Sequence, residues 1–218
     1  RPKHFICLNR NSQRPHRYYL SLFFEKNKLY DKSLYSLLFP LCENNFKKLN
    51  YLEKYKDGVS AKIPLEIDTH DRIETLEGFH TGNTFLKQNY LDSYFNIVTE
   101  TCFEAGQIFL TEKIIKPLLG LQPFLVVSSP NYLKKLKELG FKTFDMLWDE
   151  SYDTILDNED RLIKIFDLIT EISEWSLEEC EKKYKSVLDI CIYNKKHLRT
   201  FWEVDEFSKI LNSIENEW

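Results

Sequence analysis

The sequence lacks the short motifs that identify most nucleotide- and metal-dependent enzymes. It has only six glycines in 218 residues. Neither GxGxxG nor GxxxxGKS/T occurs, so the two standard glycine-rich phosphate loops are excluded. HExxH, CxxC and GxSxG are also missing, which leaves zinc proteases, thioredoxin-type redox proteins and α/β-hydrolases without support. We predict no metal site and no cofactor.

Disulfide pairs and long apolar segments are also missing. The five cysteines are an odd number and are widely spaced, and Cys7 and Cys191 stand in apolar runs typical of buried thiols. We therefore expect a reducing compartment, the cytoplasm. The frequent Lys, Asn, Ile and Phe suit an AT-rich genome, such as a viral one. No run of about 18 apolar residues occurs, so no membrane span is expected.

Charge is distributed unevenly, although the net charge is only −4. Residues 1–56 contain twelve Lys and Arg against four Asp and Glu, whereas residues 145–218 contain nine against nineteen. A basic N-terminal part is suited to an anionic ligand such as a phosphate-bearing compound. Nucleic acid is disfavoured as a partner, because the chain is acidic overall and carries no recognised nucleic-acid-binding motif.

The order of the predicted elements indicates an α/β fold. Apolar runs predict strands at 4–8, 32–38, 95–98 and 123–127, and helical spacing predicts helices between them. We expect a Rossmann-like three-layer domain with a mostly parallel sheet over residues 1–145. Residues 146–218 read as a helical extension packed on that domain. Further helices are predicted at 15–27, 40–55, 111–119, 132–139, 158–176, 177–202 and 204–218.

The first group of candidate ligand-binding residues lies between a strand end and a helix start. It contains Asn9, Arg14, His16 and Arg17, together with Arg10 and Asn11. Doubly wound sheets place ligands at the carboxyl ends of their strands. Arginine can hold phosphate oxygens through paired N–H donors, and the amides at a helix N-terminus add to this attraction. A solvated basic loop is the alternative interpretation.

The second group follows the strand at 95–98. Glu100 stands at its end and is our candidate for a catalytic carboxylate facing a sugar, although a surface acid is an equal alternative. Thr111 is a good N-cap for the next helix, and Glu112 and Lys113 stand in its first turn. The helix dipole favours Glu112 there and disfavours Lys113. A cation in that position is easier to explain if an anion binds beside it.

The segment FLTEKIIKPLLGLQPFLVVSS resembles the donor-binding C-terminal domain of GT-B fold glycosyltransferases, most closely the fucosyltransferase type. That family carries an aromatic residue, any residue, Thr-Glu-Lys, an apolar helix and a strand. Phe109 stands here where the family usually has tyrosine. The resemblance implies that Glu112 contacts ribose and Lys113 contacts phosphate. It also implies that Arg14 or Arg17 holds the diphosphate.

The resemblance implies a metal-independent transferase that uses a nucleotide sugar and an unknown glycan or other acceptor. GT-B enzymes contain two Rossmann-like halves, one of which binds the donor. We therefore expect the chain to be either the donor-binding domain of a larger protein or a compact single-domain variant. Two other classes stay open: a non-catalytic α/β interaction module that docks through its acidic helical tail, and an enzyme that modifies nucleic acid.

Overall fold

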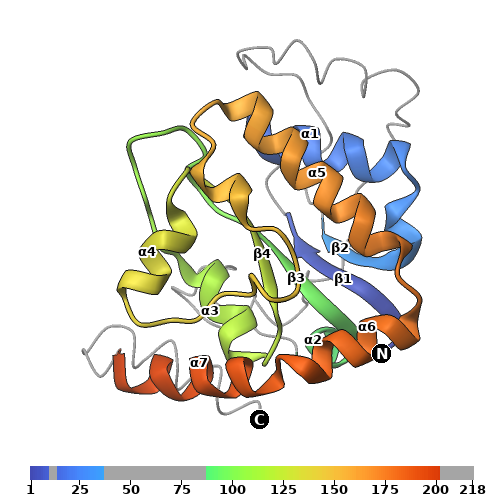
Figure 1. Cartoon of the computed structure of the whole chain (residues 1–218). Helices are drawn as coiled ribbons and strands as arrows, with labels where there is room; N and C mark the ends of the chain where they lie inside the picture. The colour runs from blue at the N-terminus through green and yellow to red at the C-terminus, as the bar shows by residue number, and fades with distance from the viewer. Residues whose placement is uncertain (10–13, 37–86, 202–218) are drawn as a thin grey trace, which may run out of the picture.

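The computed structural model describes residues 1–9, 14–36 and 87–201 of the chain (Figure 1). The helices predicted at 40–55 and 204–218 lie outside these residues, as do Arg10 and Asn11. Within the described residues none of the helices is both long and apolar enough to cross a membrane.

Four strands form one sheet: β1 (Lys3–Leu8), β2 (Ser33–Ser36), β3 (Ser93–Thr99) and β4 (Phe124–Val127). Their order is β2-β1-β3-β4, and every neighbouring pair is parallel. The prediction of an α/β fold with a parallel sheet is therefore confirmed. All four strands run in the same direction, so the loops that follow them meet at one edge, the carboxyl edge of the sheet.

The strands are buried on both faces, as parallel sheets usually are. All seven residues of β3 and all four of β4 are buried. Phe5 of β1 pairs in register with Phe95 of β3, and Asn96 pairs with Phe124 of β4. Apolar runs of this kind are the reason that the sequence predicted the strands within a few residues.

Seven α-helices occur within the described residues. They are α1 (Pro15–Lys26), α2 (Lys87–Asp92), α3 (Glu112–Leu119), α4 (Tyr132–Glu138), α5 (Asn158–Glu174), α6 (Leu177–Ser186) and α7 (Leu188–Phe201), with two short 3-10 helices at Leu29–Lys32 and Ser151–Thr154. The sequence did not predict α2, and the single helix expected at 177–202 is divided into α6 and α7 at Val187.

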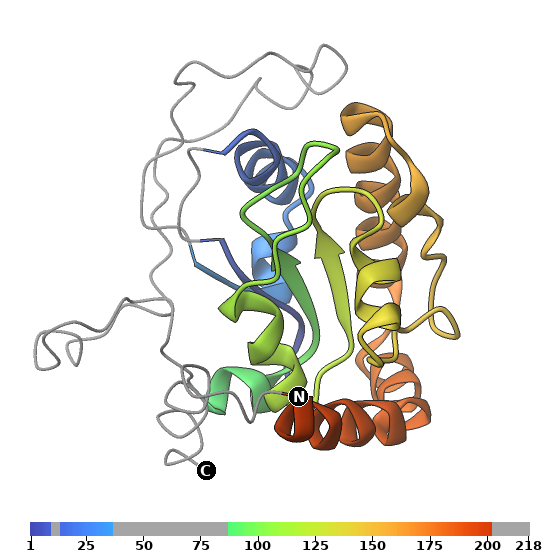
Figure 2. The ribbon, with the colours of Figure 1, turned by 90° about the vertical axis from the view of Figure 1, so that its left-hand side faces the viewer.

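The helices surround the sheet, and the C-terminal ones share its core. Figure 2 shows α3 on one side of β4 and α4 and α5 on the other. Phe23 of α1 stacks on Phe166 of α5 at 4.2 Å between ring centroids. Phe95 of β3 lies edge-on to Trp148 and Trp175. In Figure 1, α6 and α7 pass along the amino edge of the sheet, which leaves the carboxyl edge to the loops.

Candidate functional site

Five candidate residues line two separate cavities near the carboxyl edge: Arg14, His16, Arg17, Glu112 and Lys113. The first, which we call the α3 cavity, has a volume of about 90 Å³ and is lined by Leu8, Arg17, Tyr90, Asn96, Ile97, Val98, Thr99, Glu112, Lys113 and Lys116. The second, which we call the loop cavity, has a volume of about 690 Å³ and is lined by Arg14, Pro15, His16, residues 101–107 and Asn158. Arg14 and Arg17, which sequence reasoning could not separate, line different cavities.

Arg17 is the most buried cation of the α3 cavity, at 5% exposure. Its Nη2 donates to the carbonyl oxygens of Thr99 (2.7 Å) and Glu100 (3.2 Å) at the end of β3. Its Nε has no hydrogen-bond partner in the described part of the chain, and neither has the buried Thr99 hydroxyl. Burial, followed by the charge of Arg14, lowers the pKa of Arg17. In the described structure, two buried polar groups on residues that line this cavity therefore have no partner.

Thr111, Glu112 and Lys113 occupy the start of α3, as the sequence predicted. The Thr111 side chain accepts from the Lys113 backbone N–H at 3.2 Å, which makes Thr111 the N-cap. Lys113 Nζ lies 2.7 Å from Glu112 Oε1, and both side chains are about one quarter exposed. Burial acts to raise the pKa of Glu112, but the hydrogen bond and charge of Lys113 outweigh it and lower the pKa. The carboxylate of Glu112 thus already offsets the unfavourable interaction between Lys113 and the dipole of α3.

Glu100 lines neither cavity. It is completely buried, and its carboxylate accepts from the Thr111 hydroxyl and the Tyr132 hydroxyl, both at 2.7 Å. A longer contact joins it to the Thr111 backbone N–H at 3.4 Å. The geometry fits an anchor for the start of α3, in place of the sugar-facing carboxylate expected from the sequence.

Asn9 is also buried and lines neither cavity. Its Nδ2, which has two hydrogens to donate, lies 2.9 Å from the Arg17 carbonyl oxygen, 3.0 Å from the Ser21 hydroxyl and 2.7 Å from the Tyr35 hydroxyl. These contacts fix the first turns of α1 against the ends of β1 and β2. Asn9 therefore positions Arg17.

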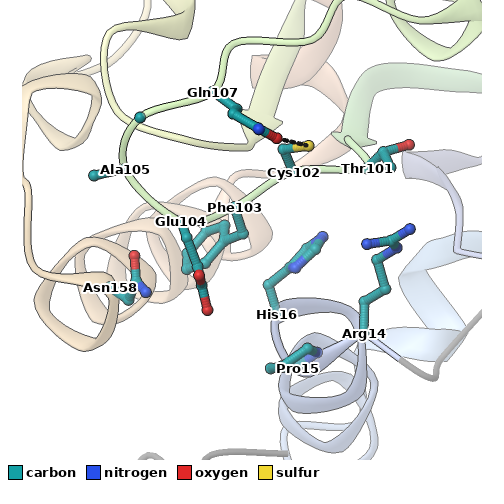
Figure 3. Close-up of a pocket in the computed structure, with 11 residues that line it drawn as sticks. Arg14, Pro15, His16, Thr101, Cys102, Phe103, Glu104, Ala105, Gln107 and Asn158 are labelled. Atoms are coloured by element: carbon teal, nitrogen blue, oxygen red, sulfur yellow. Dashed lines mark hydrogen bonds between the residues drawn. The ribbon is translucent and has the colours of Figure 1, made fainter.

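An aromatic pair lies on the wall of the loop cavity (Figure 3). The rings of His16 and Phe103 stack at 4.9 Å with 15° between their planes, and the Arg161 guanidinium lies 4.3 Å from the Phe103 centroid. The sequence indicated His16 but missed Phe103, Glu104, Gln107, Asn158 and Arg161. The available signal was Arg161, a cation in the first turn of α5, where the dipole disfavours it.

Stability should fall below neutral pH because of His16. Burial, followed by the charge of Arg17, lowers its pKa from 6.5 to about 3. Between these values the unfolded chain takes up a proton that the folded chain does not, so the stability that is present above pH 6.5 decreases as pH falls. Between pH 7 and pH 5 this amounts to about 2 kcal/mol.

Urea unfolding of the wild type and His16→Gln at both pH values measures this effect. The wild type should lose about 2 kcal/mol more than the variant. The pKa of His4 is also lowered, but His4 is present in both proteins and its contribution cancels. Equal losses in the two proteins would show that His16 takes up its proton as readily when folded.

Comparison of the chain with known protein families, with curated proteins and with solved structures finds no match. Within the described ranges, no group of three or more His, Cys, Asp and Glu residues could hold a metal ion. The functional assignment therefore depends on the chemistry of the two cavities.

Proposed function

We propose that this chain binds a nucleotide sugar at its carboxyl edge and acts as the donor-binding part of a Rossmann-like, GT-B type glycosyltransferase. One observation carries the proposal. Arg17, Glu112 and Lys113, which come from two helices almost a hundred residues apart, line the same small cavity. They are three of the residues that the sequence selected for donor binding.

The charge of the α3 cavity favours an anion. Among the described residues, Arg17, Lys113 and Lys116 line it together with one carboxylate, that of Glu112. Its volume of about 90 Å³ is roughly three times the share of one water molecule in the liquid, which suits a phosphate group. Among the described residues, the Arg17 Nε and the Thr99 hydroxyl have no hydrogen-bond partner, and buried polar groups without partners are costly.

In the proposed reaction, Glu100 does not contact the sugar. Arg17, Lys113 and the N-terminus of α3 would stabilise the negative charge that develops on the diphosphate as the glycosidic bond breaks. Glu112 would exchange its contact with Lys113 for a ribose hydroxyl. The position of Arg17 in the α3 cavity supports it over Arg14 as the diphosphate ligand. Glu100 and Asn9 would act indirectly, by holding α3 and α1 in place.

Replacing Lys113 with glutamine should weaken nucleotide binding by at least about 1 kcal/mol, or fivefold, because a charge-assisted hydrogen bond is lost. Calorimetry with UDP, GDP and dTDP and their sugars measures the change. Lys135→Gln on α4 is the matched control, because Lys135 is exposed and lines neither cavity. The proposal fails if the folded wild type binds none of these nucleotides. Equal nucleotide affinity of K113Q and K135Q would show that Lys113 does not contribute to the binding site.

A further inference from the structure

The loop cavity differs from the α3 cavity in both size and charge. Its volume of about 690 Å³ lies in the usual range for sites of small organic ligands. Among the described residues that line it, the charged side chains are Arg14 and Glu104, and their charges cancel. Although α1 has no side-chain cap and no acid in its first turn, the first turn of α5 carries Glu159 and Asp160. An anion is therefore not favoured here.

Two charged side chains of the loop cavity, those of Arg14 and Glu104, are available to a ligand in the described part of the chain. Within the described residues, neither the Arg14 nor the Glu104 side chain makes a hydrogen bond or ion pair, and both are exposed. Figure 3 shows them on opposite sides of the His16–Phe103 pair. Gln107 contributes an amide, which interacts only weakly with Cys102 at 3.9 Å. The cavity thus offers strong donors, strong acceptors and the edges of two rings.

This combination suits an uncharged compound with many hydroxyl groups. Each hydroxyl both donates and accepts, so a guanidinium, a carboxylate and an amide can all bind it. The apolar C–H groups of a sugar ring would lie against the ring edges of the aromatic pair. We propose that the loop cavity binds a glycoside, with Arg14 and Glu104 as its main polar contacts.

The two cavities share a wall, and this places the glycoside beside the donor. Thr99 lines the α3 cavity and Thr101 lines the loop cavity, so the sites are two residues, or about 7 Å, apart along the chain. Glu100 lies between these two threonines, and its carbonyl oxygen contacts the side chains of both His16 and Arg17. If the proposed function holds, a glycoside in this position is the acceptor. Its binding does not depend on that function.

Chemical-shift mapping of the full chain tests the proposal with two kinds of probe. Methyl glycosides of glucose, galactose, mannose and N-acetylglucosamine should include at least one that saturably shifts the amides of residues 101–107. Inorganic phosphate should shift those of Glu112 and Lys113. Glu104→Gln and Arg14→Gln should each weaken the glycoside about fivefold, the effect of losing one charge-assisted hydrogen bond, and leave phosphate binding unchanged. Lys113→Gln should weaken phosphate binding and leave glycoside binding unchanged.

The results separate the two proposals. Glycoside shifts centred on Lys113, glycoside affinity unaffected by E104Q and R14Q, or the absence of saturable shifts with all four glycosides would overturn the loop-cavity assignment. If a glycoside binds as expected while phosphate and the nucleotides do not, the glycoside site stands and the donor site fails. Both substituted side chains are exposed, so the variants should keep the wild-type fold, and their amide spectra verify this directly.

Discussion

Replacing Arg161 with methionine is expected to lower the free energy of unfolding by about 3 to 5 kcal/mol. Arg161 is only 1% exposed. Its guanidinium donates to the carbonyl oxygens of Ser128 (3.1 Å) and Ile155 (2.7 Å), to that of Phe103, and to Asn158 Oδ1 (2.7 Å). Methionine fills much of the volume but leaves these acceptors buried without donors. Three loops at the carboxyl edge would lose their common contact.

Lys164→Met is the control for this variant. Lys164 lies in the same helix, but its side chain is 43% exposed and pairs with Asp149 at 2.9 Å, so its replacement should cost less than about 1 kcal/mol. Arg161→Lys should fall between the two, because one ammonium group cannot reproduce the branched set of donors. Urea denaturation gives the three values. Equal stability of the Arg161→Met and Lys164→Met variants would show that Arg161 does not hold these loops together.

The sheet could be predicted because its strands are buried on both faces. In a run such as Phe95–Val98, Asn96 is the one polar residue. Its side chain is satisfied by a hydrogen bond to Gln122 at 3.2 Å, so it does not favour a loop. The boundary between α6 and α7 could not be predicted, since Val187 interrupts neither the apolar spacing nor the helix propensity. The short helix α2 has too few residues to show a period.

The candidate site was predictable in part. The rule that ligands meet at the carboxyl ends of parallel strands correctly placed Arg17, Glu112 and Lys113 near one another. It could not show that the backbone of Thr99 to Thr101 separates Arg14 from Arg17, because Arg14 is the N-cap of α1 and Arg17 lies in its first turn, and a spacing of three residues would favour a shared face. It also could not show the burial of Glu100, whose partner Tyr132 lies 32 residues away in the sequence. Contacts of this kind depend on how α3 and α4 pack, which no local pattern reports.

Glu100→Ala should destabilise the protein by about 3 kcal/mol and also weaken nucleotide binding. The substitution leaves the Tyr132 hydroxyl and the Thr111 hydroxyl and N–H without their acceptor, and each buried orphan costs about 1 to 3 kcal/mol. The pKa of Tyr132 is well above its usual value because of burial and the nearby Glu100 charge, so its hydroxyl stays a donor. Thr111 caps α3, so its release would loosen the backbone that carries Lys113.

Glu100→Gln distinguishes this anchoring role from the catalytic role that the sequence suggested. If Glu100 holds α3, the amide can accept from only one of its two hydroxyl donors, so stability and nucleotide affinity should fall together. Glu138→Gln, at an exposed position of α4, should change neither. A sugar-facing carboxylate would behave differently: Glu100→Gln would keep the wild-type unfolding curve and nucleotide affinity and lose only turnover. Because Glu100 is already fully buried against Thr111 and Tyr132, we expect the combined loss.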